Sequence, residues 1–580
     1  MKLKNIKYIA CVAALGLSMS SCEDFLNRPN EDNYNVDNFY QNAEQCYQGV
    51  NYLYNSPWYD FQRGFIKVGE VLSGNMYMGS SPYLTFTVNG TDTDLVNMSY
   101  SLWAVVGHTS VVYNNLKGAS APEDVRNACM GECLTLRALA YFYLVRTFGE
   151  VPIMHDLSAE IAGGSYNDKY KAPREDVYEY IIMTLEKAME LLPPSASKGR
   201  IDYYCAEGLL AKVYLTKAGL SGSLSADDLN KAAAYAKDVI DNSGRNLLPV
   251  YSDVFRLANN ESEESLIAWR WSSGRDPWTQ QNTLQSDLAP VGFDEFGDCW
   301  GGWCGPSVDL QDAFNFNVLS DPGSRIDTDT RRKATMATVG DKYEYFWTDK
   351  GGWDVLKFNY DTEYGKGGPG GTWQCGTGCY NVKHLYGNGY DHEQALGVAA
   401  GNMHSGLATH ILRLSDVYLI LAEAKCALTG STTDADALKA FNDVRGRAIP
   451  GFTPYTTLTW EDVWKERRLE LAHEGDRWYD YVRLSYYNMN RAISEITSQR
   501  RNTYWNIDQL FKYYYENGSW DIQKAAVSQN SGEAGYDTST AAPNVTASSF
   551  TLPFPTEDIV FNPHLTEPAQ HIDVRATFSY

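Results

Sequence analysis

The sequence has few long hydrophobic runs. Lys2, Lys4 and Lys7 precede one apolar stretch, residues 9–17, which is about half the length of roughly 20 residues that a membrane-spanning helix needs. A basic start, a short apolar stretch and small residues after it predict a secretory signal over residues 1–21. No second long run follows, so we expect the mature chain, residues 22–580, to be anchored to a membrane and not to span one.

The end of this signal has the form of a lipoprotein cleavage site. Ser20-Ser21-Cys22 follows Met19, which stands where such sites usually carry Leu. We predict that Cys22 becomes the lipidated first residue of the mature protein. The alternative is ordinary signal-peptidase cleavage nearby, which would leave Cys22 as a plain thiol.

Positive charge is scarce. The chain has 49 Lys and Arg against 72 Asp and Glu, a formal charge of −23. Removal of the three signal lysines would make it −26. A charge of this sign argues against nucleic acid and against anionic lipid surfaces as partners.

The cysteines do not form a complete disulfide framework. Of 11 cysteines, nine remain after Cys11 and Cys22 are set aside, an odd number. Cys129 and Cys133 fall in an apolar helical pattern and are expected to be buried thiols. The loop pairs Cys299/Cys304 and Cys375/Cys379 are spaced to close small local bridges. A zinc site at Cys375/Cys379 is disfavoured, because no second pair lies at ligand spacing.

The familiar catalytic signatures are also missing. The sequence has no G-x-S-x-G motif, His392-Glu393 lacks a second His at the spacing of zinc proteases, and Gly365-Lys366 lacks the rest of a phosphate-binding loop. We therefore expect no enzyme activity and no cofactor.

What the chain does have is a helix that is apolar on nearly every side. Residues 131–154 carry Leu, Tyr, Phe and Val all round the helical wheel, which predicts a buried helix. Arg137 and Arg146 would then need carboxylates or helix-end carbonyls as partners. Gly149 and Pro152 are placed to end the helix.

Further helices surround this one, and a loop-rich segment interrupts them. Helical periodicity predicts helices over residues 41–54, 102–116, 175–192, 206–217 and 229–240, and again from 412 onward. Between residues 265 and 390 the periodicity fails, while 8 of the 15 Trp and 19 of the 47 Gly gather there. We expect long loops and short strands in this segment, the usual place for a binding site on a rigid scaffold.

Several ordered blocks resemble the SusD/RagB-like family, the surface glycan-binding lipoproteins of Bacteroidetes-type bacteria. The first block is Gly131-Glu132, then Leu136-Arg137-Ala138, then the run from Tyr141 to Pro152. The later blocks are residues 413–424, 441–448, 464–480, 552–555 and 562–563. Glu23-Asp24 after Cys22 looks like the acidic surface-export signal of these bacteria, and residues 25–29 look like the family's mature N-terminus.

The resemblance implies both architecture and role. It implies a mainly α fold of tetratricopeptide-like helical hairpins, with a helical part over about 30–250, a loop-rich binding region over about 255–400 and a second helical part over about 405–580. It also implies a protein lipid-anchored at the surface of the outer membrane, which captures an oligosaccharide for nutrient uptake without cleaving it. The expected partner is a SusC-like TonB-dependent transporter. A structural calcium ion fits the family, but Asp327, Asp329 and the pair Asp92/Asp94 are too weak a pattern to place one.

The densest charge cluster, residues 466–483, has two interpretations. Its carboxylates could serve acid–base catalysis. However, Glu466, Glu470 and Glu474 are four apart with arginines interleaved, the pattern of an intramolecular ion network that locks helix packing. We favour the structural interpretation, and extend it to Arg413/Asp416 and Arg445/Arg447.

The binding candidates are mainly aromatic. Trp278 with Arg275, and Trp300 and Trp303 around a Gly pair, combine flat rings with polar neighbours, as sugar recognition requires. Trp269 and Trp271 share a face with Ile267 and are expected in the core. Family members also use a segment that maps to residues 70–77, where this chain has Gly74 in place of the usual Asp, so Asn75, Tyr77 and Tyr83 are further candidates. Trp58 and Tyr59 look exposed.

Two other functions stay open at this point. A surface glycoside hydrolase would depend on one of the many carboxylate pairs. A structural or adhesin lipoprotein would need only its partner and no sugar. The sequence does not indicate which glycan is bound.

Overall fold

The structure is a computed structural model that describes residues 39–580 without 274–277, 295–297, 401–402 and 540–542. The predicted lipidation site Cys22 and the candidate Arg275 lie outside the described residues. So do the predicted signal and mature N-terminus.

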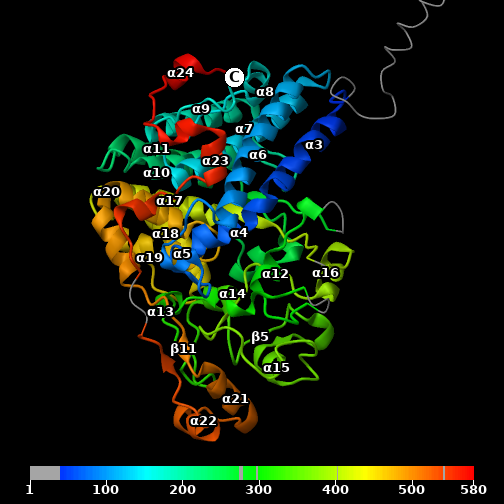
Figure 1. Ribbon diagram of the computed structural model, residues 1–580, viewed down its shortest axis with the longest axis vertical. Helices are drawn as coiled ribbons and strands as arrows, with labels where there is room; N and C mark the ends of the chain where they lie inside the picture. Colours follow the sequence, from blue (N-terminus) through cyan, green and yellow to red (C-terminus); the bar gives the residue numbers. More distant parts are fainter. Residues whose placement is uncertain (1–38, 274–277, 295–297, 401–402, 540–542) are drawn as a thin grey trace, which may run out of the picture.

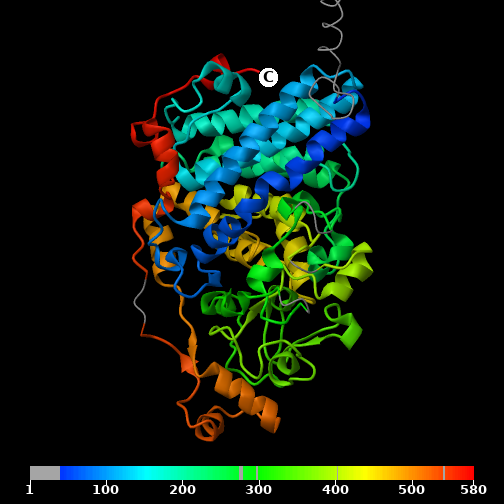
Figure 2. The same ribbon diagram turned by 45° about the vertical axis from the view of Figure 1, so that its right-hand side comes forward.

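Long helices pack in sequence order through one half of the molecule (Figures 1 and 2). Neighbours in the chain form hairpins, α6 with α7, α10 with α11 and α17 with α18, and α11 also packs on α17. The contact of α11 with α17 joins the two helical parts of the sequence into one body, called here the helical layer. Its helices are α3 (Ala43–Asn51), α6 (Thr93–Lys117), α7 (Glu123–Phe148), α9 (Arg174–Leu191), α10 (Tyr203–Lys217), α11 (Ala226–Asn242), α17 (Leu414–Cys426), α18 (Ala435–Ala448), α19 (Trp460–Leu471) and α20 (Arg477–Thr497).

Helix α7 is the buried centre of this layer, as predicted. It ends at Phe148, where Gly149 adopts φ +77° and caps it. Its two buried arginines have polar partners: Arg146 donates to the Asp476 carboxylate at 3.1 Å, as expected, and Arg137 donates to the carbonyl of His155, a loop residue, at 3.2 Å. By length and hydropathy α7 would pass for a membrane span, but 94% of its most apolar window is buried inside the protein.

The other predicted helices are present with shifted ends. The largest shift is in α6, which begins at Thr93 and not at residue 102. Asp92 causes this early start, because its carboxylate accepts from the backbone N–H of Asp94 and Leu95 and so caps the helix. The mainly helical fold predicted from the sequence is confirmed.

Short segments fill the rest of the described chain. The brief helices are α4 (Gln62–Ile66), α5 (Pro82–Thr85), α8 (Leu157–Gly163), α12 (Leu284–Leu288), α13 (Val308–Ala313), α14 (Thr330–Thr335), α15 (Val355–Tyr360), α16 (Gly389–Leu396), α21 (Ile507–Asn517), α22 (Ile522–Ser528), α23 (Thr556–Phe561) and α24 (Val574–Thr577). The strands pair only as two-stranded antiparallel ladders: β1 (Met76–Tyr77) with β3 (Gly305–Pro306), β2 (Ser265–Trp269) with β8 (Thr409–Arg413), β4 (Met336–Ala337) with β7 (Tyr380–Asn381), β5 (Lys342–Tyr343) with β6 (Trp353–Asp354), β9 (Ser431–Thr432) with β10 (Leu458–Thr459), and β11 (Tyr504–Trp505) with β12 (Gly535–Tyr536).

Most buried apolar side chains fall into two separate cores. One lies in the helical layer. The other joins the described part of residues 289–385 to residues 504–525, including α21, in what we call the loop-rich lobe. The lobe lies opposite the C-terminus in Figure 1. The two cores therefore cut across the three consecutive parts expected from the sequence, since α21 and α22 leave the last helical part to join the lobe.

The charge cluster at residues 466–483 is a buried ion network, as favoured from the sequence. Arg413 donates to Glu264 at 2.7 Å and to Glu474 at 2.6 Å, and Arg331 donates to Glu466 at 2.6 Å. Burial alone would raise the pKa of Glu470, but Arg447, Arg413 and Arg331 lower it to about 2. These carboxylates are committed to arginines inside the protein and are not offered to a ligand.

The local bridges that the spacing of Cys299/Cys304 and Cys375/Cys379 would allow are not formed. All nine described cysteines are free and buried. The Cys304 thiol donates to the carbonyl of Gly301 at 2.9 Å, and the Cys375 sulfur contacts the Thr377 hydroxyl at 3.2 Å, so each has an internal partner other than the expected cysteine. Burial raises the pKa of the Cys379 thiol, which keeps it protonated. Cys129 and Cys133 are buried thiols, as predicted.

Candidate functional site

A hollow of about 360 Å³ lies where the helical layer meets the loop-rich lobe. Elements that are far apart in the sequence form its walls: α4 and the residue after it, the start of α6, α12, and the turn that follows residue 299. The lining residues are Arg63, Ile66, Lys67, Met78, Thr93, Asp94, Leu284, Asp287, Leu288, Trp300 and Trp303.

Two tryptophans give this hollow its character. The side chains of Trp300 and Trp303 are 41% and 48% exposed, unusually high for the largest apolar side chain. Trp300 precedes a single 3₁₀ turn, Gly301–Trp303, which Trp303 ends and which lies against the end of α12. The backbone N–H of Trp300 donates to Ser286, and that of Gly301 donates to Ala289. The predicted pair of exposed indoles is therefore present, and backbone hydrogen bonds fix their turn to α12 and Ala289.

The Gly pair between the tryptophans serves close packing. A Cβ atom on Gly301 would lie 2.1 Å from the carbonyl oxygen of Asp287, and one on Gly302 would lie 1.8 Å from the side-chain oxygen of Gln374. No larger residue fits at either position without moving α12 or Gln374.

Asp287 fixes the ring of Trp300. Its Oδ1 accepts from the indole Nε1 of Trp300 at 3.0 Å, while its Oδ2 accepts from Nε of Arg63 at 3.2 Å. The carboxylate raises the pKa of Arg63 above its ordinary value. The indole, the carboxylate and the guanidinium thus form one connected rim, called here the Asp287 clamp.

The opposite wall pairs a second cation with a second carboxylate. Lys67 forms an ion pair with Asp94 at the start of α6. Met78 and Gly79 follow β1 and close this side. Gly79 has φ +47°, and a Cβ there would lie 3.2 Å from the ring of Trp303. The formal charges of Arg63, Lys67, Asp94 and Asp287 cancel across the hollow.

The segment predicted from the resemblance reaches this site, but Asn75 and Tyr83 do not face it. Asn75 is fully buried, donates to Glu70 at 2.9 Å and accepts from Arg468 at 2.9 Å. Tyr83 is fully buried and donates to Asp92 at 2.7 Å. Both are therefore corrected to structural residues, because their polar groups are committed inside the protein. Tyr77 is half-buried and pairs with Gly305 in the β1–β3 ladder, which brings its segment beside Trp303.

The other aromatic candidates divide differently. Trp269 and Trp271 are buried, as expected, and Trp58 stacks on Trp269 with ring centroids 5.3 Å apart. The expectation that Trp58 is exposed is wrong, because its indole is fully buried and donates to the carbonyl of Leu53. Tyr59 is half-buried. Arg275 lies outside the described residues, as does the side chain of Trp278.

Comparison with known proteins identifies the family. The profile of the SusD family matches residues 318–570, and a profile described as "Starch-binding associating with outer membrane" matches residues 25–215. A SusD-like protein of Bacteroides ovatus is 31% identical over 570 residues, which cover 96% of each chain. The chain belongs to the SusD family.

Solved structures of SusD-like proteins share the fold. A crystal structure described as containing a xylogluco-oligosaccharide is 28% identical, with a TM-score of 0.75 over 92% of this chain and all of that one. A protein described as a laminarin-binding SusD-like protein is 21% identical, with a TM-score of 0.61 over 90% of this chain and 98% of that one, and supports the fold alone.

The sequence analysis missed the polar half of this hollow. Arg63, Lys67 and Asp287 were not singled out, and Asp94 was considered only for calcium. One signal was available: Arg63 and Lys67 are four residues apart, so a helical segment places them on one face. Their carboxylate partners come from segments 27 and 224 residues further along the chain, and no local pattern reports such a pairing.

The aspartates considered for calcium, Asp327, Asp329, Asp92 and Asp94, all have protein partners in the structure. Asp327 pairs with Arg332, and Asp329 pairs with Arg331. Asp92 caps α6 and Asp94 pairs with Lys67. In the part of the chain that the structure describes, no group of three or more His, Cys, Asp or Glu side chains is arranged to hold a metal ion.

Proposed function

We propose that this protein binds a neutral oligosaccharide at the cell surface and passes it, uncleaved, to a SusC-like TonB-dependent transporter. The observation that carries the proposal is the pair of exposed indoles, Trp300 and Trp303, lining one hollow with a polar rim. Exposed large apolar groups that converge in a concave site usually mark a place where a ligand covers them.

The chemistry of the hollow suits a sugar. A pyranose ring presents C–H groups on its faces and hydroxyl groups at its edge. The indoles offer flat apolar surfaces for the faces. Arg63 and Lys67 offer donors for the hydroxyls, and Asp94 offers an acceptor.

The charge balance favours a neutral glycan. A uronic acid or a sulfated sugar would bring negative charge to a hollow in which two cations are already neutralised by two carboxylates. The whole chain, at −23, would add repulsion. Because one relative at 28% identity is described with a xylogluco-oligosaccharide, xyloglucan is the first candidate.

The same contacts argue against hydrolysis. A glycosidase needs two carboxyl groups free to act on opposite sides of the scissile bond, about 5–9.5 Å apart. Asp287 and Asp94 are each engaged by a cation, and the Glu466–Glu474 carboxylates lie in the buried network. We therefore propose binding without catalysis.

Surface anchoring and delivery complete the proposal. A lipid on Cys22 would hold the protein at the outer membrane, where it would cover the SusC-like transporter. Support comes from the family and from the lipoprotein-like cleavage site. Replacing Cys22 by Ser should abolish fatty-acid labelling and release the protein from the membrane fraction.

The decisive test is a binding screen of the soluble protein, starting after Cys22, against plant, microbial and host polysaccharides. We expect retention by one neutral class, and at least a tenfold loss of affinity in Trp300→Ala and in Trp303→Ala. Burial of one large side chain contributes on the order of 1.5–3 kcal/mol, and 1.4 kcal/mol is about tenfold. The matched control is Trp505→Ala, which removes a 55% exposed indole on β11, outside the hollow.

Three outcomes would contradict parts of the proposal. Binding that survives both changes would move the site elsewhere. Shortening of the bound oligosaccharide during incubation would show an enzyme. Absence of binding, together with normal growth on every glycan in a Trp300→Ala, Trp303→Ala strain, would favour a structural lipoprotein.

A further inference from the structure

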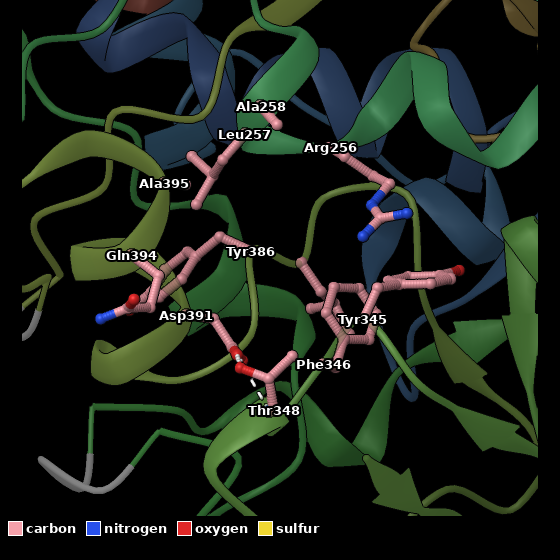
Figure 3. Close-up of a pocket in the computed structure, with 11 residues that line it drawn as sticks. Arg256, Leu257, Ala258, Tyr345, Phe346, Thr348, Tyr386, Asp391, Gln394 and Ala395 are labelled. Carbon is pink, nitrogen blue, oxygen red and sulfur yellow. Dashed lines mark hydrogen bonds between the residues drawn. The ribbon is translucent and has the colours of Figure 1, made fainter. Parts of the chain in front are cut away.

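A second hollow, of about 210 Å³, lies among residues 256–258, 345–348, 385–386 and 391–395 (Figure 3). Asp287 of α12 lines the first hollow. Gln285, two residues earlier and so rotated by about 200° around the helix, accepts from the backbone N–H of Tyr386 at 2.7 Å. Tyr386 lines the second hollow. The same short helix therefore supports both.

Four segments face this second hollow. Figure 3 shows Arg256, Leu257 and Ala258 on one side, Tyr345 and Phe346 on another, Tyr386 with Gln394 and Ala395 of α16 opposite them, and Thr348 with Asp391 below. The arrangement joins aromatic rings, small residues at the rim and a few polar groups.

The polar groups are held in place. The guanidinium of Arg256 lies over the ring of Tyr345, 4.3 Å from its centroid, and bonds Asp253 at 3.2 Å. The hydroxyl of Tyr386 donates to Asp294. The amide of Gln394 is exposed at the rim. Sites that bind a small polar ligand with an apolar face usually combine rigid aromatic side chains with a few fixed polar groups. Here the fixed groups are the Arg256 guanidinium and the exposed Gln394 amide.

We propose that this hollow is a second glycan subsite that takes one neutral sugar ring. The inference rests on the proposed function for its ligand class but not on Trp300 or Trp303. The hollow is small, at about 210 Å³, so we expect it to hold one ring of a glycan.

The charge again selects a neutral sugar. Arg256 is the cation of the hollow, and it already faces Asp253, while Asp391 accepts from the hydroxyl and the backbone N–H of Thr348. No surplus positive charge remains for a carboxylate or a sulfate. Tyr386 and the part of Tyr345 that Arg256 leaves uncovered supply the apolar surface, and Gln394 and Arg256 supply the donors for hydroxyls.

A second subsite would raise the retention of long glycans. Two weak sites on one rigid body bind a polymer more tightly than either site alone, because the second contact becomes intramolecular. Short oligosaccharides would gain nothing from it.

The test uses free glucose, galactose, mannose and xylose with the soluble protein starting after Cys22, and measures saturation transfer from protein to sugar by NMR. We expect at least one sugar to keep its signal in the Trp300→Ala, Trp303→Ala double variant. Adding Ala395→Trp, which fills the rim of the hollow, should reduce that signal to background. Adding Gln394→Ala should weaken it several-fold. The matched control is Ala162→Trp on α8, another exposed alanine.

The outcomes separate this inference from the proposed function. Signals that vanish in the double tryptophan variant, or that Ala395→Trp leaves unchanged, would overturn the second subsite while the proposed function stands. A signal lost only with Ala395→Trp, in a protein whose glycan binding ignores both tryptophans, would support the subsite and refute the first site. No signal for any of the four sugars would overturn the subsite, whatever the polysaccharide screen shows.

Discussion

Removing the carboxylate of Asp287 tests whether the clamp orients the binding surface. In Asp287→Ala, the indole of Trp300 loses its acceptor and Arg63 loses its anion. The ring of Trp300 remains but samples several rotamers. We expect the affinity for the retained glycan to fall while the fold persists.

The magnitude follows from the exposure of the clamp. A hydrogen bond to a charged group contributes about 1.5–3 kcal/mol when buried. The Asp287 side chain is 16% exposed and that of Arg63 is 55% exposed, so solvent screens part of this. About 1 kcal/mol remains, which corresponds to roughly a fivefold weaker Kd. The stability of the protein should change by at most about 1 kcal/mol, because surface ion pairs contribute little.

Titration calorimetry with the oligosaccharide selected by the screen measures this effect. The matched control is Asp312→Ala, which breaks the exposed Arg500–Asp312 pair away from the hollow and should leave Kd unchanged. A double-mutant cycle sharpens the test: in a Trp300→Ala background, Asp287→Ala should cost less than twofold. Equal losses in both backgrounds would refute the orienting role and leave Asp287 as a direct sugar contact. An unchanged Kd in the native background would refute both.

Three more predictions follow from the buried network and from Gly79. Replacing Arg413 by Met leaves Glu264, Glu470 and Glu474 without their shared cation and should lower the free energy of unfolding, measured in urea, by about 3–5 kcal/mol. The control Arg491→Met breaks a surface ion pair and should lower it by less than about 1 kcal/mol. Equal losses in the two variants would contradict the stabilising role of the network. The pKa of Glu470 is lowered to about 2 in the folded protein, so its contribution to stability should be full above its unfolded pKa near 4.5 and should be lost as the pH falls toward 2. The free energy of unfolding should therefore decrease between pH 4.5 and pH 2.5, and Glu470→Gln should make this decrease smaller. Gly79→Ala should weaken glycan binding, because the added Cβ meets the ring of Trp303, and should lower the free energy of unfolding by about 1–2 kcal/mol, because Ala disfavours a positive φ. The control Gly164→Ala has the same backbone strain at φ +72° but open space around it. It should therefore lose stability and keep its glycan affinity.

The sequence predicted the helical layer well because its signals are local. Apolar residues on all sides of residues 131–148 predicted that α7 is buried, and Gly149 predicted that it ends at Phe148. The spacing of Glu466, Glu470 and Glu474 predicted an ion network, and the structure shows one. Such patterns depend on neighbours three or four residues away, which a single sequence displays.

The binding surface was predictable only in part, since exposure in the loop-rich lobe is set by distant segments. Of the tryptophans there, Trp347, Trp353 and Trp373 lie in the core of the lobe, and only packing distinguishes them from Trp300 and Trp303. Asn75 was a candidate because the resemblance places a site segment at residues 70–77, and Trp58 was expected to be exposed, but Glu70, Arg468 and Trp269 cover them. The local bridges that the cysteine spacing allowed are absent for a different, local reason: residues between the cysteines supply partners for Cys304 and Cys375.

The position of the hollow follows from how the two cores are joined. Leu284, Leu288 and Cys304 belong to the core of the helical layer, whereas Ala289 and Cys299 belong to that of the lobe. The segment that bears Trp300 and Trp303 therefore crosses the boundary between the cores, where ligand sites commonly form.

Apolar packing alone would leave this boundary free to slide, since hydrophobic contact is not directional. Buried ion pairs cross it: from the lobe, Arg331 bonds Glu466 of α19, and Lys383 bonds Glu474 at 2.8 Å. Such pairs add little net stability, but they allow only one position of the lobe on the helical layer, because any other position leaves a buried charge unpaired. We infer that the network fixes the lobe on the helical layer and thereby sets the gap between Lys67 and Trp303. The variant Arg331→Met should then weaken glycan binding from outside the hollow, and an unaltered Kd in a folded Arg331→Met protein would show that apolar packing suffices.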